Sequence, residues 1–485
     1  MEYGRSRPLD VHKWSDYPEI DKGLINQLAR ELSLQTAKQK KHLKVVILDL
    51  YTSHESLWIA YSRVKNNYQK ASRYNKLHIG YKPLIQVIDS LERYGYIEHK
   101  KGFKDRSTGI GYQSRMRATK KLIKLIEARR VKASMIKEYE LEEVILLKDQ
   151  EGKLVEYEDT TLTMLMRIQL QIINQYLSRS LIDLDISDKE LEELEQRIAP
   201  IDFSRTRLKR IFNNGSFEQG GRFYHGWWQQ IPKEYRQYIV INSQVTTELD
   251  YSGLHFRMLY ATEGLEPPED PYQVEKLAGV DRTMIKKITN ILLNAKSLLS
   301  AKRAISQEYP ENPSELTILA IQEKHKSIEK YFHTGMGIQL QYWDSVIAEQ
   351  VMLAMNDKCW QPCLPVHDSF LVTRGSEHRL KECMEEAFNE IYPAIEAAIK
   401  RSHTNVKEDK WTTTEEGHNR IRTSAIPRVK FEENPRAAAR RRELIERIEA
   451  QDNWAWKPYV HTKWGRSKEG NDDRDLGYAV LSQRK

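Results

Sequence analysis

Two aspartates have the positions along the chain that divalent-metal chemistry requires. Asp250 follows a β-prone run from Tyr238 to Leu249 and precedes a helix-like stretch in TTELDYSGLHFRMLY. Asp368 lies at a tight His-Asp-Ser turn between two short apolar runs in CLPVHDSFLV. Carboxylates at the ends of neighbouring strands suit a pair of Mg²⁺ ions, where one ion activates an attacking oxygen and the other stabilises a leaving oxygen.

A basic helix is expected between these aspartates, over the segment DRTMIKKITNILLNAKSLLSAKRAI. It places Arg282, Lys286 and the adjacent Lys287 where positive charges neutralise a triphosphate. Each feature alone is a weak signal, because a lone strand-end aspartate is more often a cap or turn residue and a basic helix is more often simply exposed. The order of the features along the chain makes the set more specific.

In this order the segments resemble the palm and fingers motifs of family-A DNA polymerases and the related single-subunit phage-type RNA polymerases. DYSGLHFR resembles motif A, in which Asp250 matches the metal-binding aspartate and Arg257 the motif's arginine. VHDSFLV resembles motif C, where His367 and Asp368 match the HDSF form of the RNA polymerases. Arg282 matches the arginine of the R-x3-K motif B, which in the family holds the incoming triphosphate.

The resemblance covers about residues 205–400 and implies further site residues. GGRFYHGWWQQIP resembles the segment that lies along primer and template in the family, and DPYQ lies where the family has an element between motifs A and B. The two tryptophans in GGRFYHGWWQQIP have two interpretations, stacking on bases or packing in the core. The primer–template contacts implied by the resemblance are Arg222, Gln230, Arg257 and His367. The implied nucleotide-binding residues are Arg282, Lys286, Lys287, Asn294 and His255.

The chain also departs from the family pattern. Eight residues beyond Lys286 the family has Tyr-Gly, whereas this chain has Asn294 and Ala295. His255 occupies the position of the DNA polymerases' steric-gate glutamate, although the RNA polymerases carry a histidine near this point. The resemblance therefore implies two Mg²⁺ (or Mn²⁺) ions as cofactors, and DNA template and primer with nucleoside triphosphates as partners. It leaves open the preferred sugar and contact with RNA.

Residues 41–130 are expected to form a basic winged helix-turn-helix module. IGYKPLIQVIDSLERYGYIEHKKGF places apolar residues at helical spacing before Gly95, and a short strand and a Gly-punctuated basic hairpin follow. This order resembles the winged-helix superfamily. Residues 61–130 contain 18 Lys or Arg against 5 Asp or Glu, an excess that suits phosphate contact. The candidate DNA contacts are Arg63, Arg73, Lys76, Lys82, Arg115 and Arg117.

Composition limits the class of protein. Hydrophobic residues make up 40% of the 485 residues, which excludes disorder of the whole chain, and 77 Lys or Arg exceed 69 Asp or Glu, which favours a polyanionic partner. Three cysteines exclude a disulfide framework and a cysteine-rich zinc site. No apolar run approaches the roughly 18 residues of a membrane helix, so a soluble cytoplasmic protein is expected.

The expected fold class is α+β, with a right-hand polymerase palm and fingers preceded by a winged helix-turn-helix domain. The expected parts are a lead-in (1–40), the winged-helix domain (41–130), a mostly helical connecting or thumb-like region (131–204), the palm and fingers (205–400) and a basic polar extension (401–485).

Three functional hypotheses follow. The first is a template-directed nucleotidyltransferase, a DNA or RNA polymerase or primase-like enzyme that replicates or primes a mobile element. The second is a DNA-binding replication initiator or regulator with an inactive palm. The third is a promoter-directed phage-type RNA polymerase, which ranks lower because the promoter-reading insertions have no evident counterpart.

Overall fold

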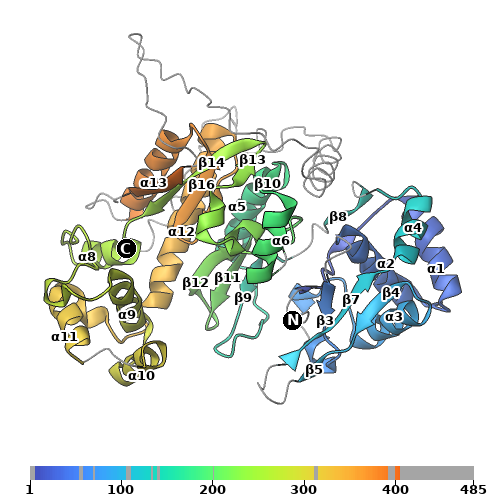
Figure 1. The fold of residues 1–485 in the computed structure, drawn as a ribbon, viewed down its shortest axis with the longest axis horizontal. Coiled ribbons are helices and arrows are strands. Elements are labelled where there is room, and N and C mark those ends of the chain that lie inside the picture. Colours follow the sequence, from blue (N-terminus) through green and yellow to red (C-terminus); the bar gives the residue numbers. More distant parts are fainter. Residues whose placement is uncertain are drawn as a thin grey trace, which may run out of the picture.

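The chain is a mixed α+β protein with two lobes, each built around its own hydrophobic core (Figure 1). The computed structural model describes residues 6–53, 58–68, 72–104, 111–132, 135–138, 143–199, 201–310, 315–391 and 399–404. The buried residues of the N-terminal core lie between positions 20 and 136, and those of the C-terminal core between 144 and 388. None of the described helices is long and apolar enough to cross a membrane. Residues 405–485, most of the expected C-terminal extension, lie outside the described residues.

The N-terminal lobe packs helices against a four-stranded sheet with the strand order β1–β3–β7–β4. Its elements are α1 (Asn26–Glu31), α2 (Ala37–Thr52), α3 (Tyr81–Arg93), α4 (Lys120–Ala128), β1 (Ser6–Pro8), β3 (Trp58–Tyr61), β4 (Ile97–Lys100) and β7 (Ser114–Ala118). Leu84, Ile88 and Leu91 are buried on one face of α3, which confirms that predicted helix. Gly95 then takes a left-handed conformation (φ 71°) that turns the chain into β4. A hairpin of β5 (Phe103–Lys104) and β6 (Gly111–Tyr112) lies between β4 and β7 in sequence.

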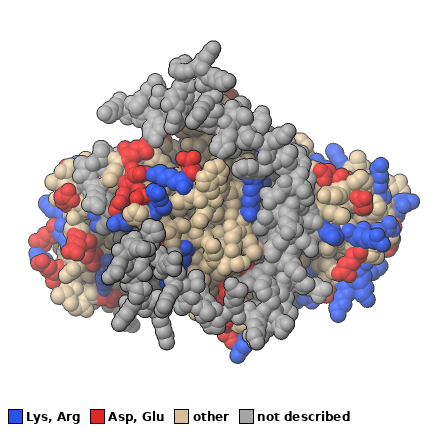
Figure 2. All heavy atoms as spheres, turned by 90° about the horizontal axis from the view of Figure 1, so that it is seen from above, with Lys and Arg blue, Asp and Glu red and all other residues tan. Residues whose placement is uncertain are grey.

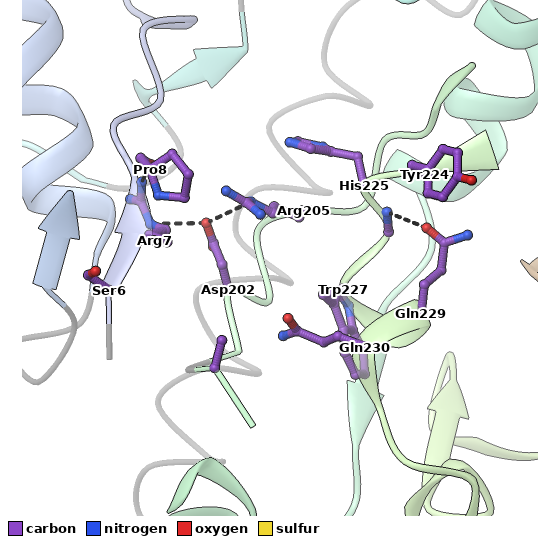
Figure 3. A pocket seen from close by; sticks show the side chains of 12 residues that line it. Ser6, Arg7, Pro8, Asp202, Arg205, Tyr224, His225, Trp227, Gln229 and Gln230 are labelled. Atoms are coloured by element: carbon purple, nitrogen blue, oxygen red, sulfur yellow. Dashed lines mark hydrogen bonds and ion pairs between the residues drawn. The ribbon is translucent and has the colours of Figure 1, made fainter. Parts of the chain in front are cut away.

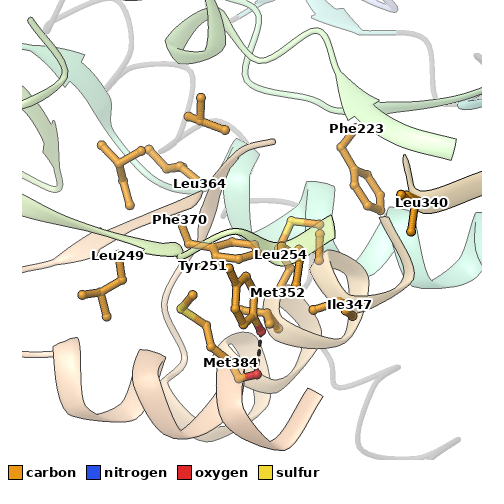
Figure 4. Close-up of a cluster of buried hydrophobic side chains, with 14 of the residues drawn as sticks. Phe223, Leu249, Tyr251, Leu254, Leu340, Ile347, Met352, Leu364, Phe370 and Met384 are labelled. Carbon is orange, nitrogen blue, oxygen red and sulfur yellow. Dashed lines mark hydrogen bonds between the residues drawn. The ribbon is translucent and has the colours of Figure 1, made fainter. Parts of the chain in front are cut away.

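The C-terminal lobe is centred on an antiparallel sheet with the order β10–β13–β14–β16–β15, and β17 also pairs with β14. These strands are β10 (Ile182–Leu184), β13 (Ile239–Ile241), β14 (Gln244–Tyr251), β15 (Leu364–Val366), β16 (Ser369–Thr373) and β17 (Ile399–Thr404). One face packs apolar side chains such as Leu249, Tyr251 and Phe370 against the helices α12 (Gly337–Cys359) and α13 (Glu377–Ile391) (Figure 4). The hydroxyl of Tyr251 donates a hydrogen bond to the carbonyl oxygen of Met384 (2.5 Å), so α13 is fixed to the sheet.

A second sheet, β9–β11–β12, packs on α12 and on α5. Its strands are β9 (Ile145–Leu147), β11 (Lys209–Asn213) and β12 (Ser216–Tyr224), and α5 spans Thr161–Ser178. The fully buried Arg210 connects the layers, because its guanidinium donates to the carbonyl of Gly221 (2.8 Å), to Glu349 (2.8 Å) and to the hydroxyl of Ser345 (3.0 Å). The buried charge is thus paired and hydrogen-bonded, as an interior arginine requires.

Two predicted elements differ from the structure. The run from Tyr238 to Leu249 is a hairpin and not one strand, because Asn242 and Ser243 both have positive φ (51° and 63°) and form the two-residue turn between β13 and β14. The helix expected over 281–305 is two helices, α9 (Arg282–Asn294) and α10 (Leu298–Glu308). The hydroxyl of Ser297 accepts from the backbone N–H of Ser300 and caps α10, so the second helix starts at a fixed residue.

Buried ion pairs tie the two lobes together. Arg7 on β1 pairs with Asp49 at the end of α2 (Nη2 to Oδ1, 2.6 Å) and with Asp202 in the C-terminal lobe (Nε to Oδ2, 3.0 Å). A second connection joins Arg73 to Glu143 (Nη1 to Oε2, 3.0 Å) and to Asp159 (Nη1 to Oδ1, 3.1 Å). The relative position of the lobes therefore depends on charge pairs that are largely removed from water.

Acid is expected to weaken this connection. Burial alone would raise the pKa of Asp202, but the charges of Arg7 and Lys13 lower it to about 2 from a usual value of 3.8. A lowered folded-state pKa stabilises the protein above about pH 4, and this stabilisation is lost as the pH falls toward about 2. In urea unfolding, Asp202→Asn should lower the free energy of unfolding by about 2 kcal/mol at about pH 7 and by less at about pH 3. A difference between parent and variant that stays constant with pH would contradict this assignment.

Candidate active site

The structure brings Asp250 and Asp368 to the same end of two neighbouring strands. Asp250 on β14 pairs in register with Ser369 on β16, so Asp368 lies one residue beyond the partner of Asp250. The backbone N–H of Tyr251 donates to the carbonyl oxygen of Asp368 (3.3 Å) and closes the ladder at this point. His367 occupies the two-residue turn between β15 and β16 with a left-handed φ of 59°, a conformation that is uncommon outside glycine.

The pair fits Mg²⁺ better than it fits a structural metal. Within the described residues, no group of three or more His, Cys, Asp or Glu side chains has a metal-binding arrangement. Mg²⁺ is commonly held by one or two carboxylates, with water and substrate phosphate as its other ligands. Two carboxylates at neighbouring strand ends therefore match the protein contribution that Mg²⁺ commonly takes, whereas a structural zinc site needs four protein ligands.

Glu248 supports the pair from the same face of β14. It lies two residues before Asp250, and side chains at this spacing share one face of a strand. Its carboxylate accepts a hydrogen bond from the hydroxyl of Ser369 (2.6 Å) and pairs with Arg236 (Nη1 to Oε1, 2.7 Å). Ser369 thereby links β16 to β14 beside the aspartates. The period-two spacing of Glu248 and Asp250 was a sequence signal for this residue, which our sequence interpretation missed.

A buried acid, Asp344 on α12, holds two of the predicted residues. Arg222 on β12 donates to Asp344 through Nε (2.8 Å) and through Nη2, and His255 Nε2 lies 3.4 Å from the same oxygen. His255 stands on α8 (Leu254–Thr262), so three elements meet at this carboxylate. Its other oxygen, Oδ1, is buried and has no hydrogen-bond partner among the described residues.

The electrostatics of this cluster extend to the aspartate pair. Burial alone would raise the pKa of Asp344, but hydrogen bonding from His255 and the charge of Arg222 lower it below its usual value. Burial lowers the pKa of the Arg222 guanidinium, but the negative charges of Asp344 and Asp368 raise it by more. The pKa of Arg222 is therefore raised overall. Partial desolvation and the charge of Arg222 lower the pKa of His367. Arg222 is therefore a positive charge that Asp344 fixes by hydrogen bonds and whose field reaches Asp368.

Tyr272 lies between the basic helix α9 and Asp368. The guanidinium of Arg282 lies 5.3 Å and the Nζ of Lys286 lies 5.6 Å from the centre of its ring. Burial and the nearby charge of Asp368 raise the pKa of Tyr272 to about 12. Lys286 has no ion-pair partner in the described part of the chain, whereas Lys287 pairs with Glu308 on α10 (2.8 Å). Of the two lysines, Lys286 is the one that lies near Tyr272.

A buried histidine fixes the segment that carries Tyr272. Arg282 forms two hydrogen bonds to Asp270 (2.7 and 2.9 Å), and His325 Nε2 lies 2.8 Å from the carbonyl oxygen of Pro271. The other ring nitrogen of His325 contacts the hydroxyl of Tyr260 (3.1 Å). Burial lowers the pKa of His325 to about 4, so the imidazole is neutral at pH 7 and can donate at one nitrogen and accept at the other.

The remaining predicted palm residues make local contacts. Arg257 donates from Nε to the carbonyl oxygen of Ser252 (2.8 Å), which supports the turn after β14. Asn294 donates to the carbonyl oxygen of Asn290 (2.8 Å) and lies so close to Gly337 that a Cβ there would be 2.0 Å from Oδ1. Gln230 is exposed at the end of a short 3₁₀ helix, η5 (Trp227–Gln230), and lies next to a cavity between the lobes. The structure does not join these three side chains to the aspartate pair through any described hydrogen bond.

Four of the six candidate DNA contacts in the N-terminal lobe already contact other side chains, and the other two are exposed without an ion-pair partner among the described residues. Arg63 forms a two-pronged pair with Asp89 (2.8 and 3.0 Å), Arg73 belongs to the connection between the lobes, and Arg117 pairs with Glu98. Arg115 is buried, and its guanidinium lies 5.3 Å from the ring of Trp58. Lys76 and Lys82 are exposed and have no ion-pair partner among the described residues. Figure 2 shows Lys and Arg gathered on the visible face of this lobe.

Both tryptophans of GGRFYHGWWQQIP are buried, which confirms the packing interpretation. Trp228 donates from Nε1 to the carbonyl oxygen of Pro365 (3.1 Å) and fastens η5 to β15. The ring of Trp227 lies edge-on to that of Trp228 (6.3 Å between centroids). The two rings are buried in the core beside β15, so they are not free to stack on a base.

A double-mutant cycle tests the Asp344 cluster. Arg222→Met alone should lower the free energy of unfolding by about 3 kcal/mol, because it leaves a buried carboxylate without its main partner. Arg222→Met combined with Asp344→Leu should cost less than Arg222→Met alone, since both charges are then removed. Urea unfolding at neutral pH measures all four proteins. Additive single-variant effects would show that the two side chains are not coupled.

The chain matches no known protein-family model, and no curated protein matches it either. Its function must therefore be argued from the arrangement of its own residues. That arrangement consists of an aspartate pair at neighbouring strand ends, an arginine held by Asp344, and a helix whose Arg282 and Lys286 lie near Tyr272.

Proposed function

We propose that the protein is a template-directed nucleotidyltransferase, a DNA or RNA polymerase or primase-like enzyme. The observation that carries the proposal is the pairing of Asp250 with Ser369, which sets Asp250 beside Asp368 in an antiparallel sheet. Arg282 and Lys286 on α9 flank Tyr272, whose pKa responds to Asp368. A carboxylate pair faced by cations is the arrangement that phosphoryl transfer to a hydroxyl requires. These features support a right-hand palm and fingers in the C-terminal lobe.

Each residue of the site has a role in this proposal. Asp250 and Asp368 would hold two Mg²⁺ or Mn²⁺ ions, which when bound supply charge neutralisation at the reacting phosphate. Lys286 binds the triphosphate directly, and Arg282 exchanges its hydrogen bonds with Asp270 for bonds to phosphate oxygens. Arg222, held by Asp344, positions the primer end. His255 lies beside this arginine, where it can contact the sugar of the nucleotide or of the primer.

The N-terminal lobe supports a DNA-binding role. Its order of elements, α2–β3–α3–β4–β7 with β7 between β3 and β4, is compatible with a winged helix-turn-helix whose wing is the β5–β6 hairpin. The exposed Lys82 lies in the first turn of α3, where the recognition helix of such a module meets DNA. A DNA-binding lobe tied to a synthetic lobe suits a protein that replicates or primes a mobile element.

Primer extension tests the proposed activity. Purified protein with Mg²⁺ or Mn²⁺ should extend a primer on a single-stranded template, with deoxy- and ribonucleotides assayed separately to establish the sugar preference. Asp250→Asn combined with Asp368→Asn should reduce extension to background, because the ion-binding charges are lost while the side-chain volumes are kept. Thermal unfolding should show that the double variant remains folded. Absence of extension by the parent on primed and unprimed templates, while it still binds DNA, would favour the initiator or regulator with an inactive palm.

The two adjacent lysines of α9 provide a matched comparison. Lys286→Ala should raise the KM for the nucleoside triphosphate roughly tenfold or more, because it removes a charge-assisted hydrogen bond to phosphate. Lys287→Ala removes the same charge from the same helix but affects only the pair with Glu308, so its KM should change less than about twofold. Steady-state extension at varied triphosphate concentration measures both. Equal effects of the two substitutions would contradict the assignment of Lys286.

A further inference from the structure

A cavity of about 310 Å³ lies between the two lobes (Figure 3). The N-terminal lobe contributes Arg7 and Pro8, and the C-terminal lobe contributes Arg205, Tyr224 and Gln230 among others. Such a volume lies at the lower end of the range for small-molecule sites, so it accepts one planar group with its substituents and not a double helix. None of these residues belongs to the aspartate pair.

Local backbone constraints build the C-terminal wall of the cavity. β12 ends at Tyr224, and His225 follows with a φ of 90°, a left-handed value that turns the chain sharply. Gly226 comes next, and a Cβ at this position would lie 2.5 Å from the ring of Trp228. The turn is therefore packed against the buried Trp228, and Tyr224 before it and Gln230 after it both line the cavity.

Three side chains of this wall have the chemistry of nucleobase recognition. Tyr224 is 36% exposed and offers an aromatic ring on which a base can stack. The amide of Gln230 is exposed, and no described residue forms a hydrogen bond with it, so both its donor and its acceptor are available to a base edge. Arg205 is partly exposed and lies 3.5 Å from Asp202, so it is a lining cation that a phosphate group can reach.

The strand β12 contributes one residue to the cavity wall and one to the candidate active site. Tyr224 lies two residues from Arg222 on the same strand, and residues at this spacing share one face. Desolvation raises the pKa of Tyr224, which also responds to the charges of Arg222 and Asp344. Tyr224 and Arg222 therefore lie on one face of β12, with Arg222 in the candidate active site and Tyr224 in the cavity wall.

We propose that this interlobe pocket binds one unpaired nucleobase of a single-stranded DNA segment. Tyr224 stacks on the base, Gln230 hydrogen-bonds to its edge, and Arg205 contacts the adjacent phosphate. The inference rests on the proposed function, because it assumes that the strand entering the pocket is the one used at the aspartate pair. It adds a contact point between the two lobes that selects unpaired over paired DNA.

Fluorescence anisotropy of a labelled oligonucleotide of about 12 nucleotides tests the pocket without metal or triphosphate. Tyr224→Ala should weaken binding about tenfold, Tyr224→Phe should bind like the parent because the ring is kept, and Gln230→Ala should bind more weakly than the parent. Arg205→Gln should reduce the slope of log affinity against log salt by about 0.7, the value for one phosphate contact on a single strand. Lys189→Gln removes a charge from the exposed surface of α6 (Asp188–Arg197) and should leave affinity and slope unchanged.

Two comparisons separate failure of the pocket from failure of the proposed activity. The Asp250→Asn/Asp368→Asn protein should bind the oligonucleotide at least as tightly as the parent, because it has lost two negative charges, whether or not the parent extends a primer. Parent-like affinity of both Tyr224→Ala and Gln230→Ala would overturn the pocket, as would an equal loss in Lys189→Gln. Thermal unfolding of each variant establishes that it is folded. Loss of binding in the pocket variants of a protein that extends no primer would uphold the pocket and reject the polymerase.

Discussion

The candidate site depends on the register of β14 against β16. A slip of one residue would turn Asp250 into the apolar core and Leu249 toward the site, because side chains alternate between the faces of a strand. The register is held from both sides, by the apolar contacts of Leu249, Tyr251 and Phe370 with the helices on one face and by the bond between Ser369 and Glu248 on the other. The chemistry of the site and the packing of the core are therefore specified by the same pairing.

Several charged side chains near this pairing are kept in place by partners on other elements. Asp344 on α12 holds Arg222 of β12 and His255 of α8, and Arg210 joins β11 to the same helix. Buried charges of this kind contribute little net stability, but removal of one partner is costly. Each of these pairs joins two elements through hydrogen bonds of defined geometry, so the polar groups near the aspartates are held in one arrangement.

Sequence reasoning found the elements whose signals are local and missed those that depend on tertiary contacts. The apolar spacing of α3, Gly95 and the two strand-end aspartates were visible because periodicity and turn residues report on neighbouring positions. Asp344 and Glu248 were not identified, because the sequence does not show which arginine pairs with a single acid on a helix or strand. Folding brings Arg222 to Asp344 and Arg236 to Glu248. The sequence likewise makes Arg73 and Arg115 candidate DNA contacts, whereas the fold engages Arg73 in an ion-pair network and buries Arg115.

The buried arginine at the start of the chain has a thermodynamic consequence for any ligand that touches both lobes. Because Arg7 bridges Asp49 and Asp202, the lobes do not behave as independent modules on a flexible tether. Once such a ligand is held by one lobe, its contact with the other becomes an intramolecular event, with an effective concentration of roughly millimolar or more. Two surfaces that each bind the ligand weakly can then bind it tightly together, because the overall affinity exceeds that of either surface alone.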